Sequence, residues 1–251
     1  MKFNIINVSN VGSTNSYAQE LNENGTLCEG DVILTHKQEK GRGQGDNFWE
    51  SEPGANLTFS LILEPEFIAP ANQFVLTQAL SLAISDLLKS YLMANNIDQE
   101  VKIKWPNDIY IENKKICGIL FQNFIKGDKI DFSIVGIGVN INQRIFYSDA
   151  KNPVSLIQYF EQDVSIDEIL ENLLSCINTR YKSLKIAIDN SLLKDEYLNN
   201  LYRYFEWADY ADDRGEFTGK IVDVDGYGRL SIEKKNGELK QYLHKEIEFL
   251  V

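Results

Sequence analysis

The chain has 251 residues, of which 43% are hydrophobic and 25% charged, and its formal net charge is −12 at pH 7. This composition is typical of a globular protein with one large domain, or with a large domain followed by a small one. The excess of acidic residues argues against general nucleic-acid binding, because neutralising phosphates requires clustered Lys and Arg. An anionic small molecule would have to be held locally, by backbone amides and a few cations.

The sequence has no apolar run long enough to cross a membrane, and its first residues lack the basic and apolar regions of a signal peptide. We therefore expect a cytoplasmic protein without membrane contact. The scattered cysteines Cys28, Cys117 and Cys176 fit reduced thiols better than disulfides or a zinc site. With only His36 and His244 available, no metal-ligating residues are predicted.

The first half of the chain predicts alternating helices and strands. A helix is expected to begin at Ser13, Thr14 and Asn15 and to end near Gly25, because Ser, Thr and Asn favour helix N-termini. Strand-like apolar runs and a helical period follow. Strands are expected at 31–35 and 56–63, with a glycine-rich loop between them, and a long helix at 72–93.

The middle and end of the chain predict a meander, two helices and a small β unit. Strands separated by short turns, which favour antiparallel pairing, are expected at 101–105, 108–112, 115–122 and 129–142. The capping-box pair Ser165 and Glu168 predicts a helix over 166–185, and a second helix is expected over 192–204. Short alternating runs after Trp207 then predict an all-β unit with turns at 225–226 and 236–237.

The loop "GRGQGDNFWESEPGAN", residues 41–56, is the first candidate site. Gly41 and Gly43 permit close approach of the backbone to a ligand, and Arg42 offers a fork of donors to a carboxylate or phosphate. The P-loop, the complete G-x-G-x-x-G motif, G-x-S-x-G and H-E-x-x-H are all absent. Taken alone, the loop is more often a flexible hairpin with a solvated arginine.

Two further stretches could carry chemistry. In "KWPNDIYIENKKICGIL", residues 104–120, Asn107 and Asp108 follow a proline and a pair of lysines precedes an apolar strand. In "GIGVNIN", residues 136–142, two glycines allow close packing, and Asn140 and Asn142 are expected on the same side of a strand. Considered separately, each stretch is better explained by a structural role than by a functional one. Turn chemistry and a solvated sheet edge account for the first stretch, and asparagines that satisfy a strand end account for the second.

In this order the motifs resemble the biotin protein ligases, which activate biotin with ATP and attach it to a lysine of a carrier domain. The similarity rests on "STN" at 13–15, Gln38 with "GRG" at 41–43, "GANL" ending at Leu57, "KWPND", "KKICGIL" and "GIGVNIN". It implies an α+β catalytic domain with a mixed or antiparallel sheet over residues 1–206 and an SH3-like β-barrel over 207–251. Some members carry an N-terminal winged-helix domain that represses transcription. This chain begins at the catalytic region, so DNA binding is not expected.

The resemblance also implies roles for individual residues. The biotin-facing residues are Ser13, Thr14, Asn15 and Gln38. Arg42 and Lys115 are expected to flank the biotin carboxylate and the α-phosphate of ATP, where two anions must meet.

Other residues of the same motifs have less defined roles. Asp108 is a candidate for orienting or deprotonating the carrier lysine, although it could also stabilise its turn or help hold Mg²⁺. Trp49 is expected either to close the loop and contact adenine or to be a buried anchor. The remaining ligand-binding candidates are Gly41, Gly43, Gln44, Gly118, Asn140 and Asn142.

Gln44 departs from the family pattern, in which further arginines often follow G-R-G. It cannot supply a second charge, so either the adenylate is held less tightly or another cation substitutes. A Gln44→Arg variant is then expected to release biotinyl-AMP more slowly.

The resemblance implies biotin and ATP as substrates, Mg²⁺ as the accompanying ion, and a biotin carboxyl carrier protein as the partner of a monomer or homodimer. A lipoate or octanoate ligase or transferase is the nearest enzymatic alternative, because it shares the fold class. A sensor that binds biotin without transferring it, or a protein that uses this surface only to dimerise, remains possible on the sequence alone.

Overall fold

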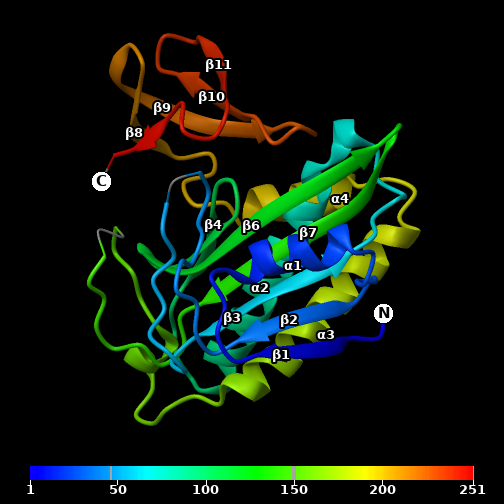
Figure 1. Ribbon diagram of the computed structural model, residues 1–251. Coiled ribbons are helices and arrows are strands. Elements are labelled where there is room, and N and C mark those ends of the chain that lie inside the picture. The colour runs from blue at the N-terminus through cyan, green and yellow to red at the C-terminus, as the bar shows by residue number, and fades with distance from the viewer. Residues whose placement is uncertain (46, 149–150, 251) are drawn as a thin grey trace.

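The computed structural model describes residues 1–45, 47–148 and 151–250. Its larger sheet has seven strands in the order β1-β2-β3-β7-β6-β5-β4 (Figure 1). These strands are β1 (Asn4–Val8), β2 (Asp31–Thr35), β3 (Leu57–Leu63), β4 (Val101–Lys104), β5 (Asp108–Ile111), β6 (Lys114–Lys126) and β7 (Lys129–Val139). The predicted meander is confirmed, because β4 to β7 pair consecutively and antiparallel.

Strand β1 was not predicted from the sequence, and it makes the sheet mixed. It pairs parallel with β2, whereas the other neighbours in the sheet are antiparallel. Asn4 and Asn7 interrupt its apolar pattern, and only the sheet edge offered by β2 supplies its hydrogen bonds. The α+β class with a mixed sheet is confirmed.

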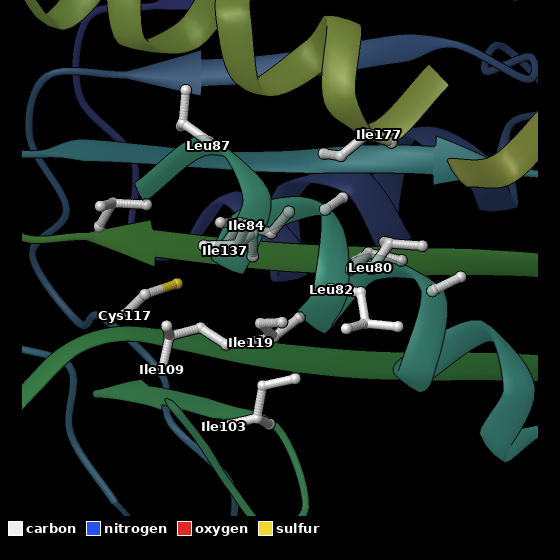
Figure 2. Packing of buried hydrophobic residues seen from close by; sticks show 14 of the residues in the cluster. Leu80, Leu82, Ile84, Leu87, Ile103, Ile109, Cys117, Ile119, Ile137 and Ile177 are labelled. Carbon is white, nitrogen blue, oxygen red and sulfur yellow. The ribbon is translucent and has the colours of Figure 1, made fainter. Parts of the chain in front are cut away.

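Helices cover both faces of this sheet (Figure 1). On one face, α2 (Phe74–Ala94) and α3 (Ile166–Ile186) enclose the main core, in which Leu80, Ile84 and Ile177 lie against strand residues such as Ile137 (Figure 2). The predicted capping box at the start of α3 is confirmed in part, since the Ser165 hydroxyl accepts a hydrogen bond of 3.3 Å from the backbone N–H of Glu168. Among the described residues, no helix is long and apolar enough to span a membrane.

The opposite face carries α1 (Thr14–Glu23) and a separate small cluster of buried apolar residues that includes Ala18, Ile62 and Ile134. Successive side chains of a strand point to opposite faces, so even-numbered residues of β3 and β7 lie on this face. Beyond the N-terminus of α1 the same rows change from isoleucine to Ser60 and Gly136. A hollow can therefore form where the helix ends.

Helix α4 (Ser191–Asn199) is shorter than the predicted 192–204. After Asn200 the chain bonds to the edge strand β4: Ile103 N–H donates to Asn200 O at 2.8 Å, and Tyr202 N–H donates to Ile103 O at 2.8 Å. Pairing with an open strand edge replaces the last predicted helical turn, because it satisfies backbone groups that the helix would otherwise have used.

The C-terminal residues form a second, five-stranded sheet in the order β11-β10-β9-β8-β12. Its strands are β8 (Trp207–Asp212), β9 (Gly215–Val224), β10 (Leu230–Lys234), β11 (Leu239–Tyr242) and β12 (Glu248–Phe249). Among the described residues no strand pairing joins β11 to β12, so the structure shows an open sheet and the predicted β-barrel is not closed. The division at 206 and 207 and the SH3-like character stay predictions.

Candidate functional site

A cleft opens on the α1 face of the large sheet, where the N-terminus of α1, the loop between β2 and β3, and the strands β6 and β7 meet. Its enclosed part has a volume of about 110 Å³. The lining includes the predicted residues Ser13, Thr14, Asn15, Gln38, Arg42, Gly43, Gln44, Trp49, Asp108, Lys115 and Gly118. Segments more than a hundred residues apart in the sequence are thus brought to one place.

The floor of the cleft is made of glycines because large side chains lie directly on it. Gly138 pairs with Gly118 across β7 and β6. A Cβ on Gly138 would overlap the Trp49 indole, and one on Gly118 would lie 3.1 Å from Trp49 Cζ3. Two residues before Gly138 on the same strand, a Cβ on Gly136 would overlap the side-chain amide of Asn15. The glycines of "GIGVNIN" and "KKICGIL" therefore make room for Trp49 and Asn15.

The "STN" stretch is held in a buried network of neutral hydrogen bonds. Gln38 Oε1 accepts from the backbone N–H of Thr14 at 2.9 Å, so it satisfies one of the free donors of the first helical turn. The Ser13 side chain makes no capping hydrogen bond. The Ser60 hydroxyl lies 2.7 Å from Thr14 Oγ1 and 2.5 Å from Asn15 Oδ1. Asn15 Nδ2 donates to Gln122 Oε1 at 3.1 Å. Fixed uncharged donors and acceptors of this kind suit a neutral polar ligand.

The glycine loop folds back on itself as a narrow hairpin. Trp49 N–H donates to Gly41 O at 2.9 Å, and Gly43 N–H donates to Asn47 O at 2.8 Å. A Cβ on Gly41 would overlap the carbonyl oxygen of Trp49, so this close backbone approach requires glycine. Gly41 is buried and does not line the cleft; it acts by bringing Trp49 over the floor.

The "KWPND" turn is fixed by three hydrogen bonds to three different elements. Trp105 Nε1 donates to Gly228 O at 3.0 Å, Pro106 O accepts from the Tyr197 hydroxyl at 2.7 Å, and Asn107 Nδ2 donates to Ile119 O at 2.9 Å. These bonds set the position of the residue that follows. Asp108 Oδ2 accepts from Lys115 Nζ at 2.6 Å, with both side chains about 30% exposed.

The two cations predicted for the site, Arg42 and Lys115, both line the cleft. Arg42 is exposed, and its Nη1 lies 3.4 Å from the Ser16 hydroxyl. The Lys115 ammonium lies 5.9 Å from the centre of the Trp49 ring. The cations thus approach from the loop and from β6, with the indole between the glycine floor and solvent, so an anion that entered the cleft could be contacted from two sides.

A more open hollow of about 660 Å³ adjoins the cleft and shares Trp49, Asp108 and Lys115 with it. Lys104 and Lys151 add positive charge to its wall, and Asn140 also lines it. The first cavity, the inner cleft, therefore combines neutral hydrogen-bonding groups with Arg42 and Lys115. The second cavity, the outer hollow, adds Lys104 and Lys151.

The two asparagines of "GIGVNIN" do not lie on a strand as predicted, because β7 ends at Val139. Asn140 Nδ2 donates to Val154 O at 3.1 Å, and Asn142 exchanges two hydrogen bonds with the backbone of Val164. Asn142 lines a separate surface hollow, so the structure does not bring it into the cleft. The side chains of Asn140 and Asn142 therefore hold the loops that follow β7, and the strand does not extend to these residues.

Several lining residues were not among the predicted site residues. Gly136 and Gly138 were seen only as packing glycines, and Thr58 and Asn107 carried no chemical signal of their own. His244 lies on the C-terminal sheet unit, and burial lowers the pKa of its imidazole, which keeps the ring neutral near pH 7. The strand period of 2 could have shown that Gly136 and Gly138 share one face of their own strand, but nothing local could have shown His244.

The described residues offer no cluster of three or more His, Cys, Asp or Glu side chains that could hold a metal ion. Asp108 is instead bonded to the Lys115 ammonium at 2.6 Å. These residues therefore do not fit a metal site formed by protein side chains alone.

The pattern of the Biotin/lipoate A/B protein ligase family matches residues 9–140. The bifunctional ligase/repressor BirA of Escherichia coli is 32% identical over 245 residues, which cover 94% of this chain and 71% of that protein. BirA of Bacillus spizizenii is 29% identical over 248 residues, covering 92% and 70%.

Among solved structures, the biotin protein ligase of Aquifex aeolicus in complex with biotin and ATP superposes with a TM-score of 0.78 at 28% identity, covering 98% of this chain and 97% of the other. Together, the family match, the sequence relatives and the shared fold identify an α+β enzyme of the ligase type. The chain belongs to the biotin/lipoate A/B protein ligase family.

Proposed function

We propose that the protein activates biotin with ATP to biotinyl-5′-AMP and transfers the biotinyl group to a lysine of a biotin carboxyl carrier protein. The observation that carries this proposal is the position of Arg42 and Lys115 in one cleft with the neutral network of Thr14, Asn15 and Gln38. The relatives support the choice of substrate, because the structure from Aquifex aeolicus holds biotin and ATP, and a relative from Paracoccus denitrificans is a biotin--[acetyl-CoA-carboxylase] ligase.

The inner cleft is the proposed biotin site. Biotin's ureido ring is neutral and carries both N–H donors and a carbonyl acceptor, which complement the amide and hydroxyl groups of Ser13, Thr14, Asn15 and Gln38. The glycine floor at Gly136 keeps the Asn15 amide close to the sheet. A charged group at this end would cost desolvation energy that an uncharged ring does not.

The first half-reaction joins two anions. An oxygen of the biotin carboxylate bonds to the α-phosphorus of ATP, the bond to the β-phosphate breaks, and pyrophosphate leaves. Arg42 and Lys115 offset the repulsion between carboxylate and phosphate and stabilise the charge that develops on the phosphoryl oxygens. The outer hollow with Lys104, Lys151 and Asn140 is the proposed nucleotide side.

Magnesium belongs to this proposal only as the ion that ATP brings with it. Mg²⁺ commonly keeps waters and substrate phosphates as its ligands. No step is therefore assigned to a protein-bound metal.

In the second half-reaction the carrier amine attacks the acyl carbon, the bond from that carbon to the AMP oxygen breaks, and the amine loses a proton. Asp108 is the proposed group that orients the lysine and accepts this proton. Its carboxylate faces both the cleft and the outer hollow, and the three hydrogen bonds of the "KWPND" turn limit its movement. Its hydrogen bond with Lys115 supports this role, because Lys115 is the residue proposed to hold the anhydride.

Asp108→Asn is expected to slow transfer from preformed biotinyl-AMP by about 10²-fold, because a neutral amide cannot accept the proton. The rate of adenylation, measured as pyrophosphate release, should fall much less. The exposed Asp98→Asn serves as the matched control. An equal loss in both half-reactions would mean that Asp108 acts only by holding Lys115 or the turn.

Mass spectrometry of a biotin carboxyl carrier domain tests the function. The domain is incubated with the protein, ATP and Mg²⁺, and with either biotin or lipoate. A gain of one biotinyl group is expected, and it should disappear with Lys115→Ala. A gain with lipoate alone would assign the protein to lipoylation. Biotin binding without adenylation or transfer would instead indicate a sensor.

A further inference from the structure

The C-terminal sheet reaches the cleft through one tight turn, residues 243–246. Glu246 N–H donates to Leu243 O at 3.1 Å, and the Glu246 carboxylate accepts from Leu243 N–H at 2.7 Å, so the turn is closed from both ends. His244 in this turn lines the cleft, and its ring centre lies 5.9 Å from that of Trp105. The bond from Trp105 Nε1 to Gly228 O joins the same two units.

Lys245 occupies the third position of this turn with φ = 75°, a left-handed conformation that normally favours glycine or asparagine. This conformation is strained for a residue other than glycine. The Lys245 side chain extends from this turn toward the glycine loop. Backbone strain at a non-glycine residue is common where structure serves a site.

The Lys245 ammonium lies against the loop at Gly45. A Cβ on Gly45 would overlap Lys245 Nζ and lie 3.1 Å from Cε, and Gly45 itself has φ = 66°. The positive φ of Gly45 favours glycine at this position, and the absence of a Cβ lets the lysine ammonium approach the loop backbone closely. The neighbour of Gly45 is Gln44, which lines the cleft and carries no charge.

The contact between Lys245 and the loop brings a positive charge close to the cleft. The chain has a net charge of −12, and the cations that line the enclosed cleft are Arg42 and Lys115. An acyl-adenylate is an anion, and a loop without a second arginine offers it less attraction. Lys245 supplies positive charge next to Gln44 from a segment 200 residues away in the sequence.

We propose that Lys245 is a positioning residue of the adenylation site, which replaces the missing loop cation and holds the loop 41–45 over the acyl-adenylate. The inference rests on the proposed function and extends it to the C-terminal sheet. That sheet is then part of the retention of the intermediate, and His244 provides a neutral wall beside it. Lys245 acts through the loop and through its charge.

The main test measures release of biotinyl-AMP from the full-length protein. Enzyme with preformed radiolabelled biotinyl-AMP is diluted into excess unlabelled ligand, and the bound label is followed. Lys245→Met should release the adenylate roughly twofold to fivefold faster, the range expected for an interaction of an exposed charge. Lys245→Arg should behave as the unaltered protein does. The exposed Lys235→Met, on the same sheet unit but in another turn, is the matched control.

A second variant tests the substitution directly. Gln44→Arg should restore slow release in the Lys245→Met background, because the loop then carries its own cation. The difference between Lys245→Met and the unaltered protein should also shrink at high salt, which screens charge but not packing. Release rates that are equal in all these proteins would overturn the inference.

Hydrogen exchange of the ligand-free protein separates this inference from the proposed function. Backbone amides of residues 41–45 and 47–48 should exchange faster in Lys245→Met than in Lys235→Met. If the unaltered protein forms no biotinyl-AMP, the proposed function fails. In that case, equal hydrogen exchange in Lys245→Met and Lys235→Met would overturn the contact between Lys245 and the loop as well. Normal adenylation with unchanged release and exchange would overturn the role of Lys245 alone.

Discussion

Replacing Lys115 with alanine is expected to lower the rate of biotinyl-AMP formation by about 10²- to 10³-fold, the usual cost of removing one group that stabilises developing charge. Lys115 extends from β6 into the cleft and faces the position where the carboxylate and α-phosphate are proposed to meet. Single-turnover pyrophosphate release measures the effect. Lys114→Ala, which removes the exposed neighbouring lysine, should leave the rate almost unchanged.

The loss of Lys115 must be distinguished from misfolding, because the variant leaves Asp108 without its ion-pair partner. Lys115→Ala should retain cooperative thermal unfolding, since both side chains are partly exposed and can be hydrated. Lys115→Arg keeps the charge but changes its geometry, so it should recover part of the activity. Adenylation at the normal rate by a folded Lys115→Ala protein would contradict the proposed role.

Gly138→Ala is expected to reduce adenylation by as much as about 10²-fold, because small displacements of positioned groups have effects of that size. The added methyl would overlap the Trp49 indole, so the ring must leave the floor and the hairpin must open. Overpacking should also destabilise the protein by roughly 1 to 3 kcal/mol. Indole fluorescence and adenylation rate, measured on the same variant, report the two effects.

A graded series makes this prediction specific to Trp49. Gly118→Ala should have a smaller effect than Gly138→Ala, since its Cβ would lie 3.1 Å from the ring rather than within it. Trp49→Ala combined with Gly138→Ala should recover stability, because the overlap is gone, but not activity. If Gly118→Ala were the more damaging change, the close contact with the indole would not explain the glycine floor.

The motifs and most elements could be predicted from the sequence because their causes are local. Apolar periodicity identified α2 and α3, and the Ser165 cap marked the start of α3. Short turns identified the meander. The end of α4 and strand β1 were missed, since both depend on hydrogen bonds to a strand distant in the sequence, β4 in one case and β2 in the other.

The residues of the cleft also divide into those that a local motif predicts and those whose position depends on tertiary contacts. Gln38, Arg42 and Lys115 were predicted because their motifs resemble a family, and all three line the cleft. Asn142 was included by its motif, yet its side chain is bonded to the backbone of Val164 outside the cleft. Hydrogen bonding to a neighbouring loop is a tertiary event, so the local pattern could not show it.

By itself, the sequence determined the α+β class, the family motifs and the chemical types needed to hold a neutral ring and an anion, because residue type and periodicity encode these properties. Only the tertiary structure decided that Trp49 lies on Gly118 and Gly138, and that Asp108 is bonded to Lys115. It also decided that Lys245 meets the loop at Gly45. Contacts of this kind depend on how separate segments pack against each other, and no spacing along the chain specifies them.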